Sequence, residues 1–170
     1  AETMQDRPRA IEVYESILDI ALEPPAVRAL EQLYQDECRW ADLVALYERQ
    51  VEAGHAAPAD LRVKIASVAS RRIGDVSRAF EELEQALAVE RQHPGAIAEL
   101  EALLAEGGEP EHRARASRLL EPVYLIRADY DRVLVTLRAR LDFTDDPTER
   151  RELLGRLAQL YEEQKEDYVS

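Results

Sequence analysis

The side chains best suited to chemistry in this 170-residue chain are a single cysteine and three histidines. His55, His93 and His112 fall at or near the ends of expected helices, and none has a histidine or carboxylate at the i, i+4 spacing of a zinc site. Cys38 has no histidine near it in the sequence that could activate its thiolate. We therefore expect solvated or helix-capping histidines and a buried free thiol. No enzyme active site, metal or other cofactor is expected in this segment.

Charged stretches offer two further possibilities for binding chemistry. Glu109, Glu111 and the acidic run 162–167 lack the alternating oxygen ligands and the glycine of a calcium loop, which favours a solvated face. The basic stretch 113–118 carries three arginines and could receive an acidic peptide or a phosphate group. It could equally form a solvated helix face balanced by neighbouring glutamates, and this second interpretation is favoured.

The overall charge excludes several classes of partner. The chain has 22 basic and 35 acidic residues and a net charge of −13, which argues against nucleic acid and against an anionic membrane surface. No apolar run reaches the ~20 residues that span a bilayer, so we expect no membrane insertion. A lone cysteine fits a reducing compartment, and we expect a cytoplasmic location. Arginine far outnumbers lysine, as is typical of a GC-rich bacterial genome.

Apolar residues recur at the helical period through nearly the whole chain, and no alternating strand pattern is found. The sequence therefore predicts an all-α fold, and short connections make successive helices antiparallel neighbours. About nine helices are expected, over 6–21, 25–36, 39–54, 58–73, 76–90, 94–105, 110–127, 129–143 and 147–165.

Two groups of residues return at fixed spacing. The first is Leu30-Glu31-x-Leu33-Tyr34 followed by Trp40, which returns ninety positions later as Leu120-Glu121-x-Val123-Tyr124 followed by Tyr130. The second is Asp6 with Ala10, Asp75 with Ala79, and a final Asp167. Such self-similarity predicts a stacked helical repeat array, with units 6–74 and 75–166.

Val27, Leu30 and Tyr34 are spaced like the fourth, seventh and eleventh positions of helix A in a tetratricopeptide repeat, and Leu43 and Tyr47 like its first helix B positions. The chain thus resembles the tetratricopeptide repeat family over nearly its whole length. The resemblance implies one right-handed α-solenoid segment over 1–170.

Two features of the sequence depart from a regular tetratricopeptide array: a proline inside one expected helix and the residues at the two ends. Pro122 should kink or break its helix, so we expect irregularity around 106–128. Neither end resembles a polar capping repeat. We therefore expect a piece of a longer array, with possible self-association through uncovered apolar stripes.

In tetratricopeptide arrays, fixed helix A positions line a concave groove. Carried over to this sequence, the resemblance implies a peptide-binding set of Arg28, Gln32, Gln35, Asp36, Ser67, Ser70, Gln159 and Glu162. The sixth expected helix has alanines at the equivalent positions, and a groove with polar walls and an apolar middle could hold an extended or helical peptide. The resemblance therefore implies a scaffold that binds a protein or peptide partner. The alternative is a regulatory or spacer segment of a larger multidomain protein, such as a signalling enzyme.

The expected helix register can be tested by truncating side chains. Tyr34→Ala and Leu120→Ala should each lower the free energy of unfolding by about 2–5 kcal/mol, because both residues are assigned to the core. Gln32→Ala should leave it almost unchanged. Urea unfolding of the three variants checks the register, which is wrong if Gln32→Ala unfolds the protein and Tyr34→Ala does not.

Overall fold

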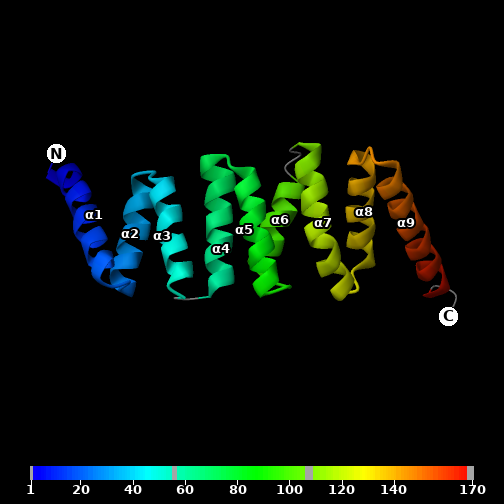
Figure 1. Cartoon of the computed structure of the whole chain (residues 1–170), viewed down its shortest axis with the longest axis horizontal. Helices are drawn as coiled ribbons and strands as arrows, with labels where there is room; N and C mark the ends of the chain where they lie inside the picture. Colours follow the sequence, from blue (N-terminus) through cyan, green and yellow to red (C-terminus); the bar gives the residue numbers. More distant parts are fainter. Residues whose placement is uncertain (1, 55–56, 106–108, 168–170) are drawn as a thin grey trace. The chain divides into compact units, whose positions relative to one another are not determined.

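A computed structural model describes residues 2–54, 57–105 and 109–167, and this part of the chain is helical without strands (Figure 1). The all-α prediction is therefore confirmed. The helices are α1 (Glu2–Ile20), α2 (Pro24–Asp36), α3 (Trp40–Glu52), α4 (Pro58–Val68), the π-helical segment η1 (Ala69–Ile73), α5 (Val76–Val89), α6 (Pro94–Ala105), α7 (Pro110–Ile126), α8 (Tyr130–Phe143) and α9 (Pro147–Asp167). In the described residues, no helix is both long and apolar enough to cross a membrane.

The chain divides into two compact units, Ala1–Val89 and Glu90–Ser170. In the first, α1 to α5 each pack against the next helix, and η1 also contacts α3, α4 and α5. In the second, α6 to α9 likewise pack in sequence order. The boundary falls between α5 and α6, so the compact units do not coincide with the sequence periods 6–74 and 75–166.

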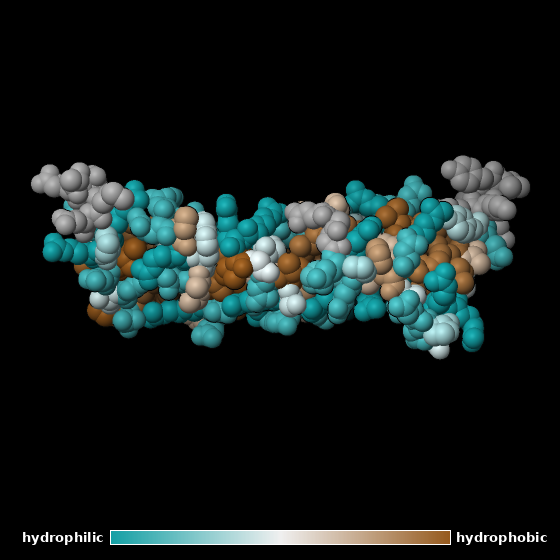
Figure 2. Space-filling view, turned by 90° about the horizontal axis from the view of Figure 1, so that it is seen from above, coloured by the Kyte–Doolittle hydropathy of each residue, from teal (hydrophilic) through white to brown (hydrophobic). Residues whose placement is uncertain are grey.

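Apolar stripes on successive helices form the core of each unit, while hydrophilic residues cover much of the visible face (Figure 2). In the first unit Leu30, Tyr34, Leu43, Tyr47 and Ile65 are all buried. In the second, the large side chains that are fully buried are Leu100, Leu120, Val133, Thr136, Leu137 and Leu153. Burying one large aliphatic side chain contributes about 1.5–3 kcal/mol, so these stripes hold each helix against its neighbours.

Pro122 does not interrupt its helix, and the break expected there is wrong. The helix α7 is continuous from Pro110 to Ile126, and Pro122 lies on its exposed side. Water can therefore reach the backbone carbonyl that the missing proline N–H leaves without its helical partner. The part of the expected irregularity at 106–108 lies outside the described residues.

The turn between α2 and α3 ends on a left-handed residue, Cys38, with φ of 54°. The N–H of Arg39 donates to the carbonyl of Tyr34 at 2.8 Å, and that of Cys38 to Gln35 at 3.1 Å, which is the hydrogen-bond pattern of a Schellman cap. Cys38 is exposed, so the expectation of a buried thiol is wrong. The turn geometry places its side chain outside the core.

The same turn recurs ninety residues later between α7 and α8. Ala128 has φ of 53°, its N–H donates to Leu125 at 3.1 Å, and the N–H of Asp129 donates to Tyr124 at 2.9 Å. The sequence echo at positions 30 and 120 therefore corresponds to two copies of one helix–turn–helix, α2–α3 and α7–α8.

Each copy also holds its helix A tyrosine in the same way. Tyr34 donates to Glu15 of α1 at 2.7 Å, and the Arg39 guanidinium lies 4.9 Å from the centre of the tyrosine ring. In the second copy Tyr124 donates to a glutamate of α6, Glu101, at 2.8 Å, with Arg132 5.4 Å from its ring centre.

The left-handed alanine suggests a stabilising substitution. Ala128→Gly should raise the free energy of unfolding by up to about 1 kcal/mol, because glycine removes the Cβ strain but loses more chain entropy on folding. Ala45→Gly, at an exposed position inside α3, is the matched control and should lower it by about 1 kcal/mol. Urea unfolding measures both. Equal destabilisation by the two variants would contradict the strain assigned to position 128.

Candidate functional site

The first unit contains a pocket of about 470 Å³ between α2 and α4, with side chains of α3 at its base. We call it the Gln35 pocket; it is lined by Gln32, Gln35, Asp36, Trp40, Leu43, Ser67, Val68, Arg71 and Arg72. Four residues of the sequence-predicted binding set thus lie together here, contributed by two helices that are separated along the chain by α3.

Polar and aromatic groups share the walls of the Gln35 pocket. Gln32 Nε2 donates to Asp36 Oδ1 at 2.7 Å along α2. On the opposite side, the Arg72 guanidinium stacks over Trp40, 4.9 Å from the ring centre. Trp40 is the only tryptophan of the chain. The pocket therefore offers hydrogen-bond donors and acceptors, a cationic group and an aromatic surface.

Arg71 and Arg72 line the Gln35 pocket but are not in the sequence-predicted set, whereas Ser70 is in that set but does not line the pocket. Ser70 is absent from the lining of the Gln35 pocket, and its hydroxyl donates back to the carbonyl of Ala66 at 3.0 Å. The π-helical segment η1 adds a residue to the last turn and so changes which side chains face α2. Arg71 could have been found, because it falls on the thirteenth position of the helix A pattern, whereas Arg72 depends on the π turn.

Arg28 lies in a second pocket between α2 and α4, of about 390 Å³, apart from the other predicted residues of α2. This Arg28 pocket is lined by Leu22, Pro24, Val27, Arg28, Glu31, Gln50 and Lys64. Lys64 Nζ lies 3.5 Å from Glu31, which links α4 to α2 by an ion pair. We refer to the two pockets together as the α2–α4 groove.

Tyr47 of α3 contacts side chains that belong to both pockets. Lys64 Nζ lies 5.1 Å from the centre of its ring, and Gln35 hydrogen-bonds to its hydroxyl. Burial, followed by the Glu31 carboxylate, raises the pKa of the Tyr47 phenol to about 12 against the opposing effect of the hydrogen bond from Gln35. The phenol is therefore neutral at physiological pH and adds no charge to the groove.

The charged residues of the α2–α4 groove are predominantly basic, in contrast to the chain as a whole. Arg28, Lys64, Arg71 and Arg72 line it together with two acidic residues, Glu31 and Asp36. The chain carries a net charge of −13. A locally positive groove on an acidic protein attracts an anionic ligand selectively to that surface.

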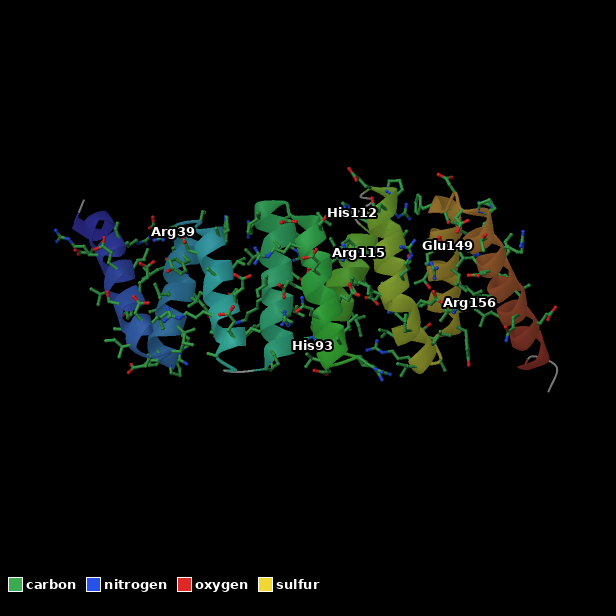
Figure 3. The ribbon with its side chains drawn as sticks, in the orientation of Figure 1. Arg39, His93, His112, Arg115, Glu149 and Arg156 are labelled. Carbon is green, nitrogen blue, oxygen red and sulfur yellow. The ribbon has the colours of Figure 1, made fainter. Side chains whose placement is uncertain are left out.

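The second unit contains the counterpart of this groove, between α7 and α9, and ion pairs occupy it. Glu121, the counterpart of Glu31, is buried and accepts from Arg140 at 2.7 Å and also from Arg156. Arg140 in turn lies 2.8 Å from Glu149. Figure 3 shows Glu149 and Arg156 extending from α9 beside α8. Arg140 stands ninety positions after Gln50, so a cation that pairs with both glutamates occupies the position that a neutral side chain holds in the first unit.

The last two predicted binding residues belong to the second unit. Gln159 and Glu162 are exposed on α9 and are therefore in a different compact unit from the α2–α4 groove. The basic stretch of α7 has partners within the protein: Arg113 stacks 4.9 Å from the Phe143 ring centre, and Arg118 lies 3.6 Å from Glu149. This pairing supports the interpretation of 113–118 as a balanced helix face.

The histidines have structural surroundings where the structure describes them. His93 is buried at the start of α6, and its Nδ1 accepts from the N–H of Ala96 at 3.2 Å, which confirms a capping role. His112 lies in the first turn of α7, while His55 lies outside the described residues. The described side chains form no group of three that could hold a metal ion.

Comparison with protein-family models, with curated proteins and with solved structures gives no match for this chain. The function is therefore inferred from the groove residues and their chemistry.

The ion pairs of the second unit lead to a pH prediction. Hydrogen bonds from Arg140 and then Thr144 hold the pKa of Glu149 below its ordinary 4.5. A carboxyl with a lowered folded pKa stabilises the fold above its unfolded pKa, and that contribution disappears as the pH falls through the folded value. Glu149→Gln should therefore be roughly 1 kcal/mol less stable than wild type at pH 7, after allowing for solvent screening. Thermal unfolding from pH 7 down to pH 3 should show this difference narrowing, and a constant difference would contradict the assignment.

Proposed function

We propose that this chain is a tetratricopeptide-like, right-handed α-solenoid of antiparallel helices, and that it binds a protein partner rather than catalysing a reaction. The ligand in this proposal is an extended, acidic peptide segment, held in the α2–α4 groove. One observation carries the proposal: the Gln35 pocket gathers Gln32, Gln35, Asp36 and Ser67, which the helix A pattern assigned to a binding wall, from two separate helices.

The side chains of the groove suit a peptide. Amides on Gln32 and Gln35 can pair with backbone N–H and carbonyl groups, while Trp40 can cover an apolar side chain of the ligand. Two neighbouring pockets, of about 470 and 390 Å³, can each take a side chain of an extended segment. Such surfaces carry binding function without a reactive centre.

The sign of the charge selects the kind of peptide. Arg28, Lys64, Arg71 and Arg72 outnumber the acidic groups of the groove, and hydrogen bonds from cations to carboxylates are stronger than neutral ones. The acidic remainder of the chain disfavours nucleic acid, and the excess of basic groups in the groove disfavours a basic ligand at that surface. An acidic segment is therefore the ligand with the best electrostatic complementarity.

Selection of peptides from a random display library, followed by binding titrations, tests this function. We expect the selected peptides to be enriched in Asp and Glu and to bind more weakly as salt is raised. The emission of Trp40, the sole tryptophan, should change on binding, because this residue lines the Gln35 pocket. The anisotropy of a labelled peptide gives an independent affinity.

Groove variants and a matched control assign the binding surface. Gln35→Ala with Arg72→Ala should weaken binding at least ~10-fold, since a charge-assisted hydrogen bond contributes about 1.5–3 kcal/mol. Glu81→Ala with Gln85→Ala, on the exposed face of α5, should not change the affinity. Equal affinities for both double variants would place the ligand elsewhere. A library that yields no binder would favour the alternative of a regulatory or spacer segment in a larger multidomain protein.

A further inference from the structure

Helix α9 repeats the sequence of α4 at a distance of 92 residues. The matching positions are Leu61 and Leu153, Lys64 and Arg156, Ile65 and Leu157, Ala66 and Ala158, and Val68 and Leu160. The repeat extends to tertiary contacts, because Lys64 and Arg156 both pair with the glutamate of the preceding helix A. The face of α4 that is buried against α5 therefore identifies the corresponding face of α9 as one suited to packing against another helix.

The two helices differ in what covers that side. In the first unit α5 packs on α4 more extensively than any other helix does, and Ala66 and the following Ala69 are buried. In the second unit α9 packs against α8 and is joined to α7 by the Arg156–Glu121 and Arg118–Glu149 ion pairs, while none of the described helices packs on its other side. Ala158 is exposed, and two large side chains on the same face, Leu154 and Tyr161, are 49% and 39% exposed.

Helix α1 repeats the sequence of α5 at a distance of 69 residues. The string Arg9-Ala10-Ile11-Glu12 corresponds to Arg78-Ala79-Phe80-Glu81, and the likeness continues to Leu18 and Leu87. In α5 the residues Ala79, Leu83 and Ala86 are fully buried. Their counterparts in α1 are half-buried, because the described helices that contact α1, namely α2 and, through Arg49, α3, leave this side of it uncovered.

The half-buried residues of α1 form part of an apolar stripe. At the helical spacing i, i+3, i+7 and i+10 it consists of Ala10, Val13, Ile17 and Ile20. Val13 is 60% exposed and Ile20 88%. Helix α1 thus has the uncovered face of an α5-type helix, and α9 has the uncovered face of an α4-type helix.

One pair of positions shows that these two faces are complementary. Arg62 of α4 and Glu82 of α5 form a partly buried ion pair at 2.8 Å across the covered interface. Their counterparts on the uncovered faces are Leu154 and Val13. Both charges have been replaced by aliphatic side chains, so the pair remains matched, since a change on one side alone would set a charge against an apolar group.

We propose that a second copy of this chain covers these faces, with α9 of one copy packing on α1 of the next as α4 packs on α5. The contact joins two different surfaces, so it is heterologous and propagates head to tail, closing into a ring or extending as a fibre. Leu154 and Val13 meet at its centre. Their burial, with that of Tyr161 and Ile17, supplies the hydrophobic driving force.

Sedimentation velocity over a range of concentrations tests the assembly. The wild-type chain should form species larger than a single chain, in proportions that rise with concentration. Val13→Glu alone and Leu154→Arg alone should each return the sedimentation coefficient to that of a single chain, because each sets a charge against an aliphatic partner. Both residues are exposed, so the thermal unfolding midpoints should stay close to wild type and exclude misfolding as the cause.

Rescue by charge pairing makes the test specific for these two faces. Val13→Glu and Leu154→Arg chains, each of single-chain size alone, should form a complex when mixed, since together they recreate the Arg62–Glu82 pair at the contact. The double variant in one chain should regain concentration-dependent assembly. A wild-type chain that stays single at all concentrations, or single variants that do not associate on mixing, would overturn the proposal.

Discussion

Helices such as α4 carry more apolar surface than one neighbour can cover, and that constraint organises the rest of the structure. Helix α4 shows the satisfied state: it packs against α3 on one side and α5 on the other, and its alanines are buried. On α1 and α9, which have a packed helix on one side only, apolar side chains of the same pattern remain exposed. Each of these helices therefore needs a second neighbour to bury its apolar side chains.

The helix A tyrosines show how polar groups fit within this packing. Tyr34 and Tyr124 bury their rings against the next helix, and each hydroxyl needs an acceptor that only the preceding helix can supply. Burial raises the pKa of Tyr124 to about 12, with the hydrogen bond to Glu101 adding to the effect. The arginine over each ring comes from a different position in the two copies, because Arg39 precedes α3 whereas Arg132 lies in the first turn of α8. The contact between an arginine and the tyrosine ring is therefore present in both copies, although the arginine occupies a different sequence position in each.

Sequence reasoning found the helices and much of the α2–α4 groove, and the failures have physical causes. Helical periodicity and the prolines at helix starts determine element positions, which explains why α2, α4, α6, α7 and α9 begin close to where they were expected. Periodicity assumes a regular helix, so it could not anticipate that the π turn η1 would bring Arg72 to the groove. Nor could it show that Pro122 faces solvent, where its helix tolerates it, or that a left-handed turn leaves Cys38 exposed.

The two copies of the groove also show how one position can change the use of a surface. Position 50 holds a glutamine, and the Glu31–Lys64 pair beside it leaves pockets open on both sides of Tyr47. Position 140 holds an arginine, which draws Glu121 and Glu149 into one buried network and joins α7, α8 and α9. A carboxylate buried with two arginines is already compensated and has little to offer an incoming ligand. The same helix arrangement therefore leaves open pockets in the first unit, where we propose that a peptide binds, and joins three helices through ion pairs in the second. The difference follows from whether the residue at position 50 or 140 is neutral or charged.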